Sequence, residues 1–185
     1  MVSLSSLWLP ILLSAVAVFI ASSVTHMVLG YHKTDFARVP DESGATSALR
    51  ALNIPPGDYM MPWAAGSEAM KDPVFVERMR TGPNVVMTVL PPGLFNMGTL
   101  LGKWFVYCLI VSLFAGYVAS RTLGPGTPYM SVFRVAGTVA FAGYTLALWQ
   151  NVIWYSKSTT TTTKSTFDGL IYALLTGGVF GWLWP

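Results

Sequence analysis

The sequence predicts an all-α integral membrane protein with four transmembrane helices and a partly helical extramembrane insertion between helices 1 and 2. Of the 185 residues, 53% are hydrophobic and only 10% are charged, whereas soluble domains carry about 25% charged residues. Four apolar stretches are long enough to cross about 30 Å of hydrocarbon at about 1.5 Å per residue. Most of the charge lies in one segment, residues 31–98, which holds six basic and seven acidic residues.

The first predicted membrane helix lies within residues 1–30, where Leu7 to Gly30 carries no charge. A secretory signal is the alternative interpretation of such an amino-terminal apolar run. No Lys or Arg precedes the run, and it is longer than the apolar core of a typical signal. A membrane helix is therefore the favoured interpretation.

Residues 31–98 form the predicted extramembrane insertion, which is rich in proline and methionine. Residues 41–53 could form one short helix. Residues 72–82 predict a second, because Asp72 can cap it, Pro73 suits its first position and Gly82 suits its end. Residues 84–90 favour a strand. Such short elements bury little apolar surface alone, so we expect the insertion to pack on a partner protein or on the membrane face; a loosely ordered loop is the alternative.

The second, third and fourth membrane helices are predicted within residues 99–185. Their ranges are about 99–121, 129–155 and 167–185. Residues 156–166 contain five consecutive threonines and are predicted to be a flexible polar linker.

Small residues recur at helical spacing in these three helices, and such faces allow close helix–helix approach in lipid. The predicted helix-packing positions are Gly169, Ala173, Gly177 and Gly181 in the fourth helix, Ser112, Gly116 and Ser120 in the second, and Ala136, Ala140, Gly143 and Ala147 in the third.

Lysine and arginine residues near the helix ends predict the orientation. They are more frequent on the side that carries the 31–98 insertion, and basic residues favour the cytoplasmic side. We therefore expect a bacterial cytoplasmic membrane protein with a cytoplasmic insertion and both termini outside.

One histidine, His26, is a candidate ligand for a pigment or haem, because it falls inside the first predicted helix. Ser22, one turn earlier, would leave room for a flat ring. His32 lies six residues further on, which is the opposite face of any continuing helix. The favoured alternative is that His26 forms hydrogen bonds with a neighbouring helix or with interfacial water. No metal site is predicted.

Two charged residues, Lys103 and Asp168, begin predicted helices on the same side of the membrane and could form an ion pair. Asp168 also suits the positive end of its own helix. The alternative role for Asp168, a proton or ion site for transport, is less favoured because no charged residue lies near the middle of a span.

No catalytic motif occurs in the chain, so we expect a protein that is not an enzyme. The single cysteine, Cys108, excludes an internal disulfide, and the small net charge of +3 gives no indication of a nucleic-acid partner. The expected partners are membrane lipid and other membrane subunits.

The sequence favours a non-catalytic accessory subunit of a larger membrane complex, with respiratory and photosynthetic assemblies as candidates. A small transporter or permease is the first alternative, in which the hydroxyl-bearing residues near midspan would line a cavity. They are Ser112, Thr138, Tyr144, Thr145 and Thr176. A pigment- or haem-binding subunit that uses His26 is the second alternative.

Overall fold

The computed structural model describes all 185 residues and divides them into two units. The helical unit comprises residues 1–37 and 96–185, and the inserted unit comprises residues 38–95. Each unit is described by itself.

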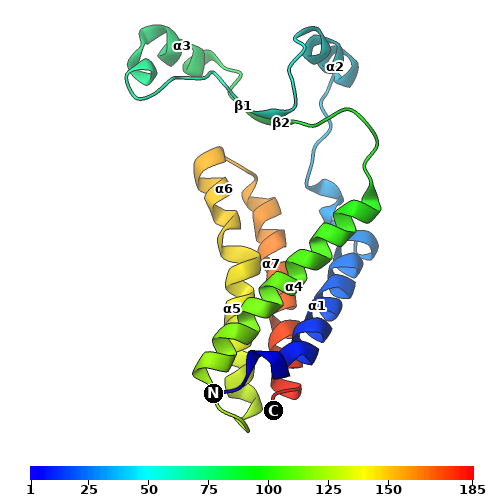
Figure 1. The fold of residues 1–185 in the computed structure, drawn as a ribbon. Helices are drawn as coiled ribbons and strands as arrows, with labels where there is room; N and C mark the ends of the chain where they lie inside the picture. The colour runs from blue at the N-terminus through cyan, green and yellow to red at the C-terminus, as the bar shows by residue number, and fades with distance from the viewer. The chain divides into compact units, whose positions relative to one another are not determined.

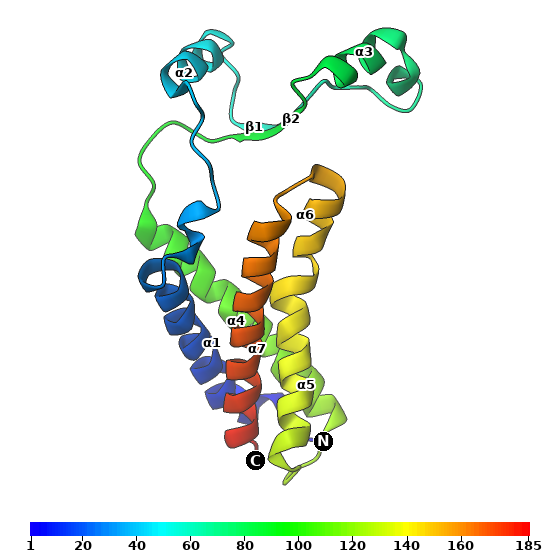
Figure 2. The same cartoon turned by 180° about the vertical axis from the view of Figure 1, so that it is seen from behind.

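Four long helices pack side by side in the helical unit (Figure 1 and Figure 2), and the two chain ends lie at the same end of this unit. The helices are α1 (Trp8–Ser23), α4 (Met97–Thr122), α5 (Tyr129–Phe141) continued by α6 (Leu148–Tyr155), and α7 (Thr159–Trp182). A 3₁₀ turn, Leu4–Leu7, precedes α1, and a π turn, Val24–Val28, follows it. A second π turn, Ala142–Leu146, joins α5 to α6.

Three helical stretches are long and apolar enough to span a membrane: Leu4–Val28, Met97–Thr122 and Tyr129–Tyr155. They match the first three predicted spans, so the prediction of a mostly helical chain with membrane-spanning helices is confirmed for these three. The fourth helix of the unit, α7, is not among them.

The small residues of α7 lie against α5 and the π turn that follows it. A Cβ atom added at Gly177 would lie 2.7 Å from the Phe133 carbonyl oxygen, and one added at Gly181 would lie 2.7 Å from the Tyr129 ring. Gly169 contacts Thr145, and Ala173 is buried. These positions therefore let the two backbones approach closely.

The small residues of α4 and α5 also lie in helix contacts, with one exception. Ser112, Gly116 and Ser120 are buried, as are Ala136 and Ala140, and Gly143 contacts Val111 of α4. Ala147 is exposed. A π turn holds one more residue per turn than an α-helix, so the turn at Ala142–Leu146 rotates Ala147 away from the face that precedes it.

One fully buried hydrogen bond between α1 and α4 links Ser14 Oγ and Ser112 Oγ at 3.0 Å. The single Ser14 hydroxyl proton is shared with the closer Pro10 carbonyl oxygen, at 2.6 Å. The interhelical contact is therefore secondary to a bond within α1.

We expect a double-mutant cycle of Ser14→Ala and Ser112→Ala to give a coupling energy of about 0.6 kcal/mol, typical of interhelical hydrogen bonds in membranes. Chemical unfolding in detergent micelles would measure it. Ser23→Ala is the control, because Ser23 bonds only the Phe19 carbonyl of its own helix and should not couple to Ser112. A coupling energy of zero between Ser14 and Ser112 would contradict the assignment.

The segment predicted as a flexible linker is instead the start of α7, which begins at Thr159. Ser158 caps the helix by accepting a hydrogen bond from the Thr161 backbone N–H at 3.2 Å. The Thr163 hydroxyl donates a hydrogen bond to the Thr159 carbonyl oxygen at 2.9 Å, and the Thr166 hydroxyl donates one to the Thr162 carbonyl oxygen at 2.8 Å. The Ser158 cap satisfies a free N–H group at the start of the helix, which favours a helix where composition alone predicts a linker.

The inserted unit contains α2 (Glu42–Ala51), β1 (Gly57–Met61), α3 (Pro73–Thr81) and β2 (Val85–Val89). Both predicted helices form. Asp72 caps α3 as predicted by accepting from the Val74 N–H, and Asp41 caps α2 by accepting from the Gly44 N–H. The predicted strand is β2, which pairs antiparallel with β1. No residue of this unit is buried.

Candidate functional site

Polar side chains gather at the end of the helical unit opposite the chain termini. They come from the π turn that follows α1, from the 3₁₀ turn Tyr31–Thr34 and from the first half of α7. We call the group of His26, Tyr31, His32, Asp35, Lys164 and Asp168 the His–Asp cluster. Asp168 is the most buried of its charged groups, with a side chain only 3% exposed.

A glycine turn brings the two histidines together. Gly30 has a φ of +67°, a left-handed conformation that costs glycine little. The helix therefore stops, and the chain folds back so that the His26 and His32 rings stack with centroids 4.2 Å apart and planes 6° apart. The sequence spacing would place the rings on opposite faces of any continuing helix, but the helix does not continue past Gly30, so the rings can meet.

The His32 ring lies between two carboxylates. His32 Nδ1 lies 2.6 Å from Asp35 Oδ2, and His32 Nε2 lies 2.7 Å from Asp168 Oδ2. A neutral imidazole has one N–H donor and one lone pair. Two ionised carboxylates can therefore both be satisfied only if a second proton or another cation lies in the cluster.

The His26 ring is held through its Nδ1 atom. His26 Nδ1 lies 3.0 Å from the Ser22 carbonyl oxygen and 3.0 Å from Thr25 Oγ1. Because a carbonyl oxygen only accepts hydrogen bonds, Nδ1 carries the proton and Nε2 keeps its lone pair in the neutral ring. Thr25 Oγ1 in turn lies 3.3 Å from the Tyr172 hydroxyl of α7.

The Lys164 ammonium ties α7 to the turn that carries His32. It donates to the Tyr31 carbonyl oxygen at 2.7 Å, to Thr34 Oγ1 at 2.8 Å and to Asp35 Oδ1 at 2.9 Å. Partial burial raises the pKa of Asp35, but the hydrogen bonds from His32 and Lys164 outweigh it and leave the pKa below its usual value. Asp35 is therefore ionised at neutral pH.

The predicted ion pair between Lys103 and Asp168 does not form. Lys103 is on an exposed face of α4, whereas Asp168 faces the turn after α1 and bonds the Tyr31 hydroxyl and His32 Nε2. A histidine and a tyrosine thus take the place of the lysine.

The room predicted for a flat pigment beside His26 is filled. The Trp104 indole N–H donates to Ser22 Oγ at 2.8 Å, so a large ring covers the small residue. A pigment or haem on His26 stays an untested prediction, and this packing does not favour it.

Three side chains of the cluster offer a set of metal ligands. One nitrogen atom each of His26 and His32 and one carboxylate oxygen of Asp168 lie within 4.8 Å of one another. From the sequence, His26 and Asp168 were singled out separately, and their position together with His32 was missed. For His32 the sequence holds one signal, Gly30, because a glycine between two histidines permits the chain reversal that stacks their rings.

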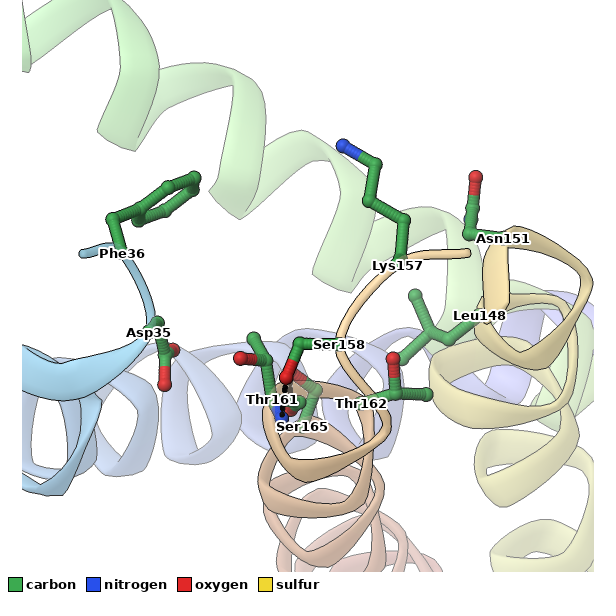
Figure 3. A pocket seen from close by; sticks show the side chains of 9 residues that line it. All are labelled: Asp35, Phe36, Leu148, Asn151, Lys157, Ser158, Thr161, Thr162 and Ser165. Carbon is green, nitrogen blue, oxygen red and sulfur yellow. Dashed lines mark hydrogen bonds between the residues drawn. The ribbon is translucent and has the colours of Figure 1, made fainter. Parts of the chain in front are cut away.

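A pocket of about 330 Å³ borders the cluster (Figure 3). Asp35 lies at its edge, and Lys157, Ser158, Thr161 and Ser165 give it a polar lining. Both carboxylate oxygen atoms of Asp35 already have partners, so this residue offers the pocket no free charge. Asp35 is the only member of the His–Asp cluster that lines the pocket.

Comparison of the chain with known proteins gives no relatives: no family model, no curated protein and no solved structure matches it. The class of protein defined by the fold is a helical bundle with three helices able to span a membrane and one inserted unit.

Proposed function

We propose that this chain is a non-catalytic accessory subunit of a larger membrane protein complex. The observation that carries the proposal is the inserted unit, residues 38–95, in which no side chain is buried. Its large apolar side chains face outward instead: Trp63 is 72% exposed, Leu52 67% and Phe95 73%.

Such a unit needs another surface for stability. A two-stranded hairpin is marginal by itself in water, and ordering each residue costs about 1–2 kcal/mol of backbone entropy. Burial of apolar side chains normally offsets this cost, and the inserted unit buries none. A partner protein that covers Trp63 and its neighbours would supply the missing burial.

The apolar outer surface of α7 supports a membrane location for this helix, and we propose that α7 is the fourth span. From Phe167 onward, its exposed large side chains are apolar: Phe167, Leu170, Leu174 and Trp182. A helix that faced water would expose polar residues there. The excess of Lys and Arg on the inserted side supports an insertion in the cytoplasm of a bacterium and both termini outside.

The structure does not favour the transporter alternative. Ser112 bonds Ser14 of α1, Thr145 bonds the Phe141 carbonyl and Thr176 bonds the Tyr172 carbonyl, while Thr138 is exposed. The three bonded hydroxyl groups therefore have separate partners, two of them within their own helices, and Tyr144 is the one candidate whose hydroxyl is buried without a partner.

Gentle extraction from native membranes, followed by a native gel and mass spectrometry of the band, tests the proposal. We expect a band much larger than the 20.1 kDa chain, with defined companion proteins. A visible spectrum of the same band would show whether the complex is coloured, as respiratory and photosynthetic assemblies are.

The variant Trp63→Ala sharpens this test, because loss of a central interface tryptophan costs about 2 kcal/mol or more and should shift the chain out of the large band. Trp8→Ala is the matched control: Trp8 is 63% exposed but belongs to the helical unit. A single-chain band for the unaltered protein, with the amides of the inserted unit protected from exchange, would refute the proposal.

A further inference from the structure

We propose that His26, His32 and Asp168 form a binding site for a divalent transition-metal ion of the zinc type. The three side chains come from two segments that are far apart in the sequence, and their donor atoms lie within 4.8 Å of one another. Ligand atoms on one zinc ion lie about 3–3.5 Å apart, given bonds of about 2.0–2.2 Å. Because the two rings are stacked in nearly parallel planes, one ring must rotate before both nitrogen lone pairs can point at one ion.

The hydrogen bonds at the far side of each ring prepare the histidines as ligands. His26 Nδ1 is held by the Ser22 carbonyl oxygen, and His32 Nδ1 by the Asp35 carboxylate. Metal-binding histidines almost always donate their second N–H to a carbonyl or carboxylate, which fixes the tautomer and makes the ligand more basic. In both rings this arrangement leaves Nε2 as the lone-pair donor.

The contact between His32 and Asp168 indicates where a cation belongs. With the His32 proton on Nδ1, the Nε2 lone pair faces Asp168 Oδ2 at 2.7 Å, so two acceptors oppose each other. A proton or a metal ion must lie between them for this contact to be favourable. His26 Nε2 has no hydrogen-bond partner, and a metal ion is the cation that would use all three donors at once.

The donor types select the class of ion. Two imidazole nitrogens and one carboxylate suit Zn²⁺ and Fe²⁺, whereas Ca²⁺ and Mg²⁺ prefer oxygen ligands. No thiolate lies in the cluster, which disfavours Cu⁺. Three protein ligands leave a coordination position for water or a solute. The Tyr31 hydroxyl, which bonds Asp168, is an outer-shell partner that orients the carboxylate.

Titration of the full-length chain in detergent, purified without a polyhistidine tag and stripped of metal, tests this site. Calorimetry with Zn²⁺ should give one ion per chain, and Co²⁺ should give visible absorption of a four-coordinate centre. The thermal midpoint should rise with Zn²⁺, because an ion that binds only the folded state stabilises it.

The most informative variant is His26→Asn, because the His26 side chain is exposed and the Asn amide can still donate to Ser22. We expect the Zn²⁺ affinity to fall by more than about 100-fold, because replacing a residue that only hydrogen-bonds to a metal ligand already lowers affinity by about 10–100-fold. The affinity of Asp168→Asn should fall as far. The affinity of Asp35→Asn should fall by about 10–100-fold, because Asp35 bonds the ligand His32. Asp58→Asn is the control, because Asp58 is an exposed acid of the inserted unit bonded only by Thr88.

Absence of stoichiometric binding to the unaltered chain would overturn the metal site, as would Zn²⁺ affinity that is unchanged in His26→Asn. The cluster would then be a hydrogen-bonded contact, with a shared proton, between the turns that follow α1 and helix α7. This test is independent of the proposed accessory role, because the variants at His26, Asp35 and Asp168 lie in the helical unit, leave Trp63 and the inserted unit unaltered, and should leave the large native band in place.

Discussion

Replacement of Gly177 by leucine is expected to lower the free energy of unfolding of the helical unit by about 1–3 kcal/mol, the usual cost of overpacking. A Cβ atom at this position would lie 2.7 Å from the Phe133 carbonyl oxygen and 3.2 Å from Gly137 Cα. Both neighbours are backbone atoms, which cannot move without separating α5 from α7. Unfolding in mixed micelles, followed by circular dichroism, would measure the loss.

Gly178 offers a matched control one residue away. A Cβ atom there would have the Tyr129 hydroxyl as its nearest neighbour, at an ordinary 3.6 Å. Alanine is favoured over glycine inside a helix by about 0.8–1 kcal/mol, so Gly178→Ala should be neutral or stabilising, whereas Gly177→Ala should destabilise. Equal effects of the two alanine variants would show that the α5–α7 contact at Gly177 is not as close as described.

Replacement of Lys164 by methionine is expected to lower the free energy of unfolding by about 1.5–3 kcal/mol, the range for hydrogen bonds that involve a charged group. The side chain is only 20% exposed, so solvent screens its contacts weakly. Its loss leaves the Asp35 carboxylate with His32 alone and frees the Tyr31 carbonyl oxygen. Compared with the unaltered protein, the backbone amides of residues 31–35 should then exchange faster, whereas those of α4 should exchange at the same rate.

Lys157→Met is the control for this variant, because Lys157 forms no ion pair and no side-chain hydrogen bond in the structure. Its free energy of unfolding should change by less than about 0.5 kcal/mol, as at most surface positions. Unchanged exchange of residues 31–35 in Lys164→Met would contradict the role assigned to the ammonium group.

Most helices of the fold could be predicted from the sequence, because their signals are local. A run without charge identifies a span wherever it occurs, and Asp72, Pro73 and Gly82 mark both ends of α3. The third span was also predicted as one helix from Tyr129 to Tyr155, and the π turn inside it left no signal in the composition.

The start of α7 and the strand β1 were missed because their signals are not local. The run of threonines has low helix propensity, and it is helical through the Ser158 cap and the contact of Lys164 with the turn at Tyr31. Strand β1 exists because β2 pairs with it. Residues such as Met60 and Met61 carry no strand pattern of their own.

The candidate site could be predicted only in part. His26 and Asp168 stand out in the sequence as rare polar groups at the edges of apolar runs. The approach of His26 to Asp168 depends on the packing of α1 against α7, and the position of His32 beside them depends on the positive φ of Gly30. The pairing of Asp168 with Lys103 failed because neither residue begins its helix: α4 begins at Met97 and α7 at Thr159, and Asp168 faces the turn after α1.

The threonine turns at the start of α7 have a consequence for motion. Threonine is a weak helix former, and hydroxyl groups that return to carbonyl oxygens in the preceding turn weaken and bend a helix. Local opening of a protein begins in its least stable segment, and in the helical unit these turns meet that description. Fraying as far as Lys164 would release the Tyr31–Asp35 turn while the remainder of α7 stays packed by Gly177. Opening of these turns would therefore expose the His–Asp cluster without unfolding of the bundle.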